Sequence, residues 1–149
     1  VSKKSLAEAE EWFREQPLSA ARLLVTHHPL DLPGNSPKRK LARKSKRGVY
    51  HLSRSHIDLY LSGHYHRSSA VVTRARYQKD HYAAIALQAG TVSLRSRGQS
   101  QSFNLLRIEK GHIEVTIYTW HPSRKRFMEM ESIAFHQNES GWWPLTKDT

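Results

Sequence analysis

The chain has 149 residues with a hydrophobic content of 38%, including 4 Trp, 6 Tyr and 4 Phe, which is enough for the core of one modest domain. It contains no cysteine, so disulfides and thiolate metal sites are excluded, and any metal must be bound by imidazole, carboxylate or amide groups. The formal net charge of +11 favours an acidic partner such as nucleic acid or a phosphate ester. No apolar run approaches about 18 residues and no signal peptide is evident, so we expect a cytoplasmic protein with no membrane partner.

The first part of the chain, residues 1–67, predicts one helix followed by a βαβ unit. Leu6, Ala9, Trp12 and Phe13 recur at helical spacing over residues 3–15, and Pro17 ends this segment. The short apolar run 23–25 predicts a buried strand that ends in "THHP". A basic helix over residues 36–56, weakened at a glycine, and a second strand ending in "GHYH" complete the unit. Both strands of this unit therefore end in a histidine loop.

The second part, residues 68–136, has the alternating pattern of antiparallel strands. Turns such as residues 109–112 separate five segments that are rich in alternating apolar and β-branched residues. These segments are 69–77, 81–92, 102–109, 112–121 and 126–135. Residues 137–149 are interpreted as a tail whose Trp142 and Trp143 either dock on the body or extend from it. The predicted fold class is α/β with a mixed sheet, in which an antiparallel meander follows Arg67. No linker divides the chain, so we expect a single unit.

The two histidine loops predict a metal site. The carboxyl ends of adjacent parallel strands meet at one edge of a sheet, which would bring three imidazoles together. In an extended chain alternate side chains share a face, so His64 and His66 are expected to point the same way and His27 and His28 opposite ways. Imidazole nitrogen suits transition metals such as Zn and Fe. An isolated strand-end histidine is more often structural, but the joint spacing of these loops favours metal.

The blocks Thr26-His27-His28-Pro29 and Gly63-His64-Tyr65-His66 resemble the last two signature blocks of the calcineurin-like metallophosphoesterases. Those blocks are a strand-end histidine shortly before a proline and a Gly-His-x-His loop. The stretch "LQAGTVSLRSRGQSQSFNLLRIEKGHIEV" is similar to the strands that follow this loop in bacterial members, so the resemblance covers roughly residues 20–135. It implies the C-terminal half of a layered β-sandwich flanked by helices.

In that family two divalent transition metals, here Mn, Fe or Zn, activate a water molecule that hydrolyses a phosphomonoester or phosphodiester. The resemblance implies that His27, two residues before the proline, and His64 bind one metal and that His66 binds the other. His28, Tyr65 and Arg67 are candidates for contacts to the substrate or to the ligands.

The first three blocks of the family are absent from this chain. No Asp-x-His, Gly-Asp or Gly-Asn-His occurs, and these blocks supply the bridging aspartate, an asparagine ligand and the histidine that protonates the leaving group. Together with the start at Val1, this absence predicts a fragment that binds metal only in part, contains no proton donor and is inactive alone. We expect the missing N-terminal half, or a copy of the same chain, to cover the exposed sheet.

Two other functions stay open. Seven Lys or Arg residues lie between Lys38 and Arg47. They are open to three interpretations: a solvated helix face, a surface that steers a phosphorylated substrate, or the nucleic-acid-binding surface of a non-catalytic module. No aromatic residue lies between Lys38 and Gly48, which disfavours a stacking platform for single strands. The other possibility is that this chain is one half of a split enzyme whose first half is a separate chain. The remaining histidines are assigned surface or structural roles: His51, His56, His81, His112, His121 and His136.

Overall fold

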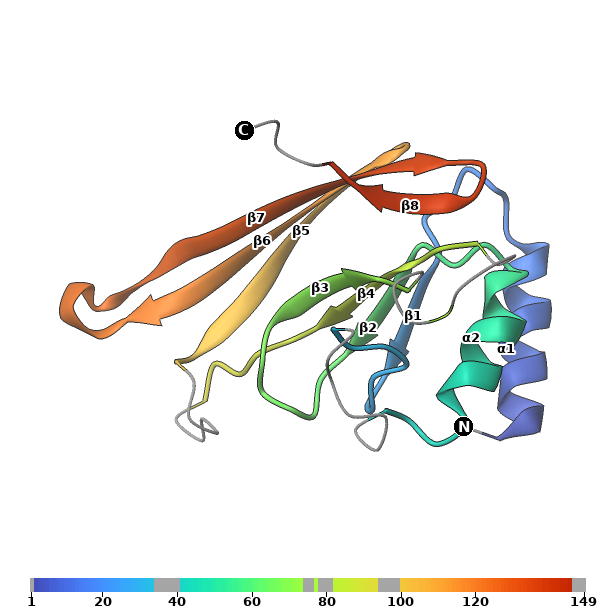
Figure 1. The fold of residues 1–149 in the computed structure, drawn as a ribbon, viewed down its shortest axis with the longest axis horizontal. Helices are drawn as coiled ribbons and strands as arrows, with labels where there is room; N and C mark the ends of the chain where they lie inside the picture. The colour runs from blue at the N-terminus through green and yellow to red at the C-terminus, as the bar shows by residue number, and fades with distance from the viewer. Residues whose placement is uncertain (1, 34–40, 74–76, 78–81, 94–99, 146–149) are drawn as a thin grey trace.

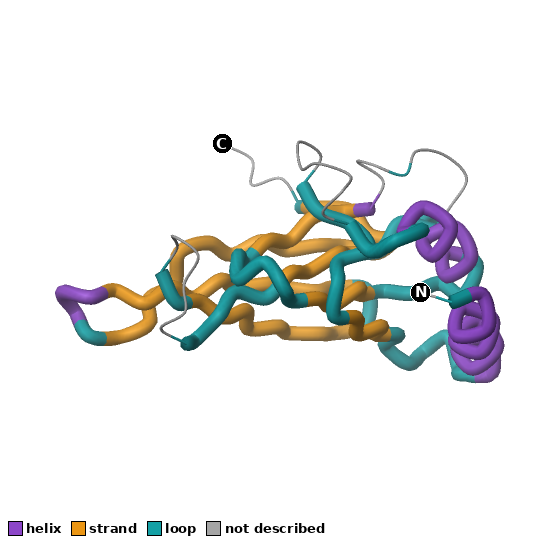
Figure 2. Tube along the Cα trace, turned by 90° about the horizontal axis from the view of Figure 1, so that it is seen from below, coloured by secondary structure: helices purple, strands orange, loops and turns teal. Residues whose placement is uncertain are grey.

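The computed structural model describes residues 2–33, 41–73, 77, 82–93 and 100–145. In these residues the chain forms three layers: a pair of α-helices, a first sheet and a second sheet. The helices cover one face of the first sheet, and the second sheet packs on its other face (Figure 1). Figure 2 shows both helices gathered at one end of the molecule. No helix within the described ranges is long and apolar enough to cross a membrane.

Helix α1 spans Lys3–Glu15, as predicted, and helix α2 spans Ser45–Ser53. The Ser2 hydroxyl accepts the Ser5 N–H at 3.0 Å and caps the start of α1. Helix α2 begins later than predicted because Lys44 has a φ of 63°, outside the helical region. Residues 36–40 of the predicted helix lie outside the described residues.

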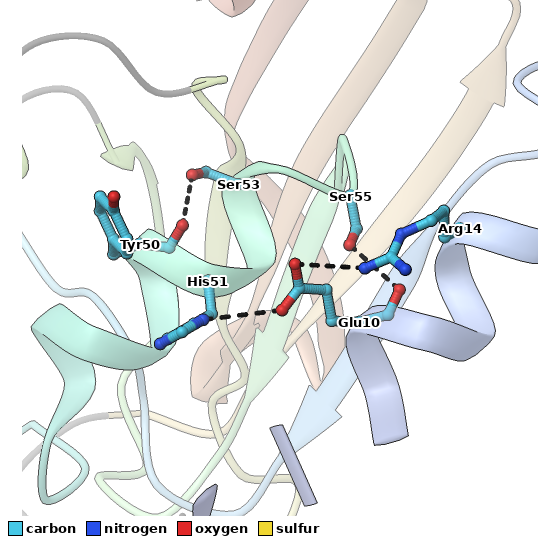
Figure 3. A network of polar contacts seen from close by, with 6 residues as sticks. All are labelled: Glu10, Arg14, Tyr50, His51, Ser53 and Ser55. Carbon is cyan, nitrogen blue, oxygen red and sulfur yellow. Dashed lines mark hydrogen bonds and ion pairs between the residues drawn. The ribbon is translucent and has the colours of Figure 1, made fainter. Parts of the chain in front are cut away.

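Glu10 joins the two helices. Its carboxylate lies 3.6 Å from His51 Nδ1 and 3.5 Å from the Arg14 guanidinium, and its carbonyl accepts the Ser55 hydroxyl at 3.3 Å (Figure 3). Ion pairs near the surface contribute at most about 1 kcal/mol each, so apolar packing stabilises the contact between the helices more than these pairs do. That packing buries residues of both helices: Leu6, Phe13, Val49 and Leu52.

The first sheet, sheet A, contains β1 (Leu23–Thr26), β2 (Leu59–Ser62), β4 (Ile85–Gln88) and β3 (Ser69–Val72), in that order. Strands β1, β2 and β4 are parallel, and β3 is antiparallel to β4. The prediction that only an antiparallel meander follows Arg67 is therefore wrong for β4. All four residues of β4 are buried because both faces of the sheet are covered, and this burial is typical of a parallel strand.

The second sheet, sheet B, is an antiparallel meander of β5 (Ser102–Glu109), β6 (His112–His121), β7 (Arg126–Asn138) and β8 (Gly141–Pro144). The structure confirms the predicted bounds of β5 and β6. Gly111, with a φ of 73°, forms the tight turn between them. A short 3-10 helix, Pro122–Arg124, lies in the connection between β6 and β7. Residues 141–144, interpreted as part of a tail, form a strand and bury Trp142.

Side-chain alternation along sheet A creates two cores. Tyr60, Ala84 and Ala86 pack against the helices, whereas Leu59, Ile85 and Leu87 pack against sheet B. The sheet is thus fixed from both faces, and the loops that follow its parallel strands begin on a rigid edge.

Candidate metal centre

Three histidines meet at the carboxyl edge of sheet A. Thr26 and Ser62 are register partners at the ends of β1 and β2, so the loops that follow start side by side. His27 Nε2 lies 2.9 Å from His64 Nδ1, and one ring nitrogen from each of His27, His28 and His64 lies within 4.8 Å of the others. The predicted convergence of the two histidine loops is therefore observed.

The first loop bends immediately after β1. The Thr26 hydroxyl donates a hydrogen bond to the His28 carbonyl at 2.8 Å, and Pro29 is buried directly behind it. The rings of His27 and His28 are consequently 4.8 Å apart, rather than on opposite faces. The expectation of opposite directions is wrong because these residues do not continue the strand.

The second loop is a tight turn. The Tyr65 N–H donates to the Gly63 carbonyl at 3.0 Å, and both His64 and His66 have left-handed backbones, with φ of 75° and 58°. The argument from strand alternation therefore does not apply to His64 and His66. His66 lies outside the group of three histidines formed by the described residues. Left-handed residues other than glycine cost about 1–3 kcal/mol and cluster at functional sites, which makes this loop a candidate site on backbone grounds as well.

Strand β4 supports the second loop. The Ala89 N–H donates to the Ser62 carbonyl at 2.7 Å, and the Gln88 side-chain amide donates to the Gly63 carbonyl at 3.1 Å. Asn104, from β5, in turn donates its side-chain amide to the Gln88 carbonyl at 3.0 Å. Sequence reasoning missed Gln88 and Asn104. For Gln88, the local sign in the sequence is an amide residue at the end of the apolar run 83–87.

One aromatic ring contacts His64, and exposed cations occur in the segments near the histidine loops in the sequence. The Tyr65 ring packs edge-on against His64 at a centroid distance of 4.7 Å, and Arg67 is exposed. Four cations of the predicted basic helix are also exposed: Arg43, Lys44, Lys46 and Arg47. These exposed cations, with the net charge of +11, favour an anionic ligand.

The three imidazoles fit a transition metal. Two nitrogens that bind one zinc ion at about 2.0–2.1 Å are roughly 3.0–3.4 Å apart, close to the 2.9 Å between His27 and His64. Neutral imidazole suits zinc, iron and nickel better than magnesium or calcium. The group of described residues includes no carboxylate, so a binuclear site would need further ligands.

No protein-family model and no curated protein matches the chain. The chain is similar to solved structures of Vps29 from Entamoeba histolytica. A single mutant matches with a TM-score of 0.37 and 17% identity, covering 56% of this chain and 45% of that chain. A double mutant matches with a TM-score of 0.40 and 16% identity, covering 66% of this chain and 52% of that chain. The chain thus spans about half the length of these structures.

Vps29 has a metallophosphoesterase-like fold. The similarity covers only part of each chain.

Proposed function

We propose that the carboxyl edge of sheet A is the partial metal centre of a metallophosphoesterase. The observation that carries this proposal is the convergence of His27 and His64, from two separate strand-end loops, to 2.9 Å between ring nitrogens. A hydrogen bond between two imidazoles at an exposed edge contributes little stability, whereas a small reorientation of the two rings would aim both nitrogens at one metal.

His27 and His64 would hold one metal, with His28 close enough to be a third ligand or to contact the substrate. The role of His66 as ligand of a second metal is supported by the resemblance alone. Bound metals would supply an activated water molecule and offset the charge of the phosphoryl oxygens. Arg67 and the exposed cations Arg43, Lys44, Lys46 and Arg47 would attract the phosphoester and orient it.

The remaining ligands and the proton donor would come from residues outside this chain. Among the strands that the structure describes, β1 is the end strand of sheet A, and Val25 is 73% exposed. A further strand of a partner, or of a longer form of the protein, could pair with this free edge and bring carboxylate ligands to it. We therefore propose that the chain alone hydrolyses no phosphoester; hydrolysis by the purified chain, with or without a chelator, would contradict this.

Nucleic-acid binding without catalysis is the second candidate. The exposed cations at residues 43–47 and the formal charge of +11 favour it. Salt-dependent binding of oligonucleotides that is unchanged in His64→Ala would support this alternative.

The proposal is tested by calorimetric titration of the chain with zinc and manganese. We expect one metal to bind per chain, and we expect His64→Ala to weaken binding at least about tenfold because two ring nitrogens no longer converge. His121→Ala is the matched control, since it removes an exposed imidazole at the far end of β6. Equal affinities of the wild type, His64→Ala and His121→Ala would reject the site.

A further inference from the structure

Gln88 is a buried amide in contact with the backbone of the histidine loop. It is the last residue of β4 and is 3% exposed. A buried amide costs about 1–3 kcal/mol unless it is hydrogen-bonded, and its position in the strand would suit an apolar residue. Its side-chain nitrogen donates to the Gly63 carbonyl at 3.1 Å, so the amide is bonded to the residue that precedes His64.

The Gly63 carbonyl is held from two sides. It accepts the Gln88 amide at 3.1 Å and the Tyr65 N–H at 3.0 Å. These two bonds fix the peptide plane between Gly63 and His64, at the point where the backbone enters its left-handed conformation. The direction of the His64 ring toward His27 depends on that plane.

Gln88 is itself fixed by sheet B. The Asn104 side-chain amide donates to the Gln88 carbonyl at 3.0 Å, which links β5 to the end of β4. Two consecutive hydrogen bonds, from Asn104 to Gln88 and from Gln88 to Gly63, thus link the second sheet to the histidine loop.

We infer that Gln88 is a positioning residue that holds His64 in its ligand geometry, with Asn104 as its support. This inference rests on the proposed metal centre. The ligand held in this way would be a divalent transition metal, and Gln88 would act through the Gly63 carbonyl without touching the metal.

The test replaces Gln88 by Met, which has similar length but no donor. Nitrogen-15 chemical shifts of the imidazoles, recorded without metal at one fixed pH, report the hydrogen bond between His27 and His64. We expect Gln88→Met to change these shifts and to weaken zinc binding about tenfold. Asn104→Ser is expected to have a smaller effect in the same direction.

Thr73→Val is the matched control. Thr73 is also 3% exposed, and its hydroxyl accepts the Ala84 N–H at the opposite end of β4, at 3.1 Å. We expect this variant to lose stability in urea without changing the imidazole shifts or the zinc affinity. A similar loss of stability in both variants, with altered shifts in Gln88→Met only, would separate positioning from folding.

Imidazole shifts of Gln88→Met that match the wild type would overturn the inference, even if zinc binds. A wild-type chain that binds no zinc would refute the proposed function instead, and the metal-free shifts would still decide whether Gln88 positions His64.

Discussion

Asp58 shows how single polar residues connect the layers at the amino edge of sheet A, opposite the histidines. Its carboxylate accepts the Arg22 N–H and the Trp142 indole N–H, both at 2.8 Å, and the Tyr82 hydroxyl at 3.3 Å. Arg22 precedes β1 and Trp142 lies in β8, so one buried carboxylate joins both sheets. The sequence gives no local sign of this role, because the partners are separated by up to 84 residues.

Tyr82 is expected to make the folding stability of the chain fall with rising pH in the alkaline range. Burial is the main cause that raises the pKa of Tyr82 from 10.0 to about 12, and the nearby charge of Asp58 adds to it. Burial also raises the pKa of Tyr60. Between pH 10 and about 12 the folded chain keeps the Tyr82 proton that the unfolded chain loses, so folding stability falls as pH rises through this range.

We expect the urea midpoint of the wild type to fall between pH 9 and about pH 11.5, and the fall to be smaller in Tyr82→Phe. The Phe variant is less stable at pH 9, because it loses the hydroxyl bonded to Asp58, but it lacks the proton linkage. Parallel curves for the two proteins would contradict the role of Tyr82.

At the scale of elements, alternation and turn residues predict sheet B well. Strands β5 and β6 match their predicted bounds because each alternates a more covered face with a more open face and they share a turn at Gly111. Alternation fails in the histidine loops, where left-handed residues replace extended chain. Helical spacing likewise assigns Trp12 to the apolar stripe of α1, yet Trp12 is 56% exposed while Phe13 is buried. The Gln88 contacts depend on strand order, which local patterns do not contain.

Strand β8 depends on one glycine. Gly141 has a φ of 111°, and a Cβ at this position would overlap the backbone of Ala83. The close approach lets the Trp142 N–H reach the Ala83 carbonyl at 2.8 Å, which joins β8 to the start of β4. The docking of the segment interpreted as a tail is therefore set by a residue without a side chain.

We expect Gly141→Ala to lower the free energy of unfolding by about 2–3 kcal/mol through backbone strain and overlap. Gly63→Ala is the control, since no atom lies within 4 Å of a Cβ there, and we expect a change of at most about 0.5 kcal/mol. Urea denaturation followed by tryptophan fluorescence measures both. Equal losses would show that β8 tolerates a side chain at its first residue.

At the scale of the whole molecule, the polar network that joins the sheets and the group of histidines lie at opposite edges of sheet A. The Asp58 network joins the sheets at the amino edge, and the histidines lie at the carboxyl edge, where parallel strands commonly place binding sites. Among the described strands β1 lies at the edge of sheet A, beside the histidines, so a further strand there and further ligands of the proposed metal centre would meet at one place. Under the proposed function, this arrangement would preorganise part of the metal centre in a chain that we expect to be inactive alone.

The most direct test is anomalous diffraction at the zinc edge from crystals of the chain grown with zinc. We expect a peak about 2.0–2.1 Å from both His27 Nε2 and His64 Nδ1, and we expect the peak to be lost in His64→Ala. No peak at this edge, or zinc held only by other histidines such as His112 and His136, would contradict the metal centre.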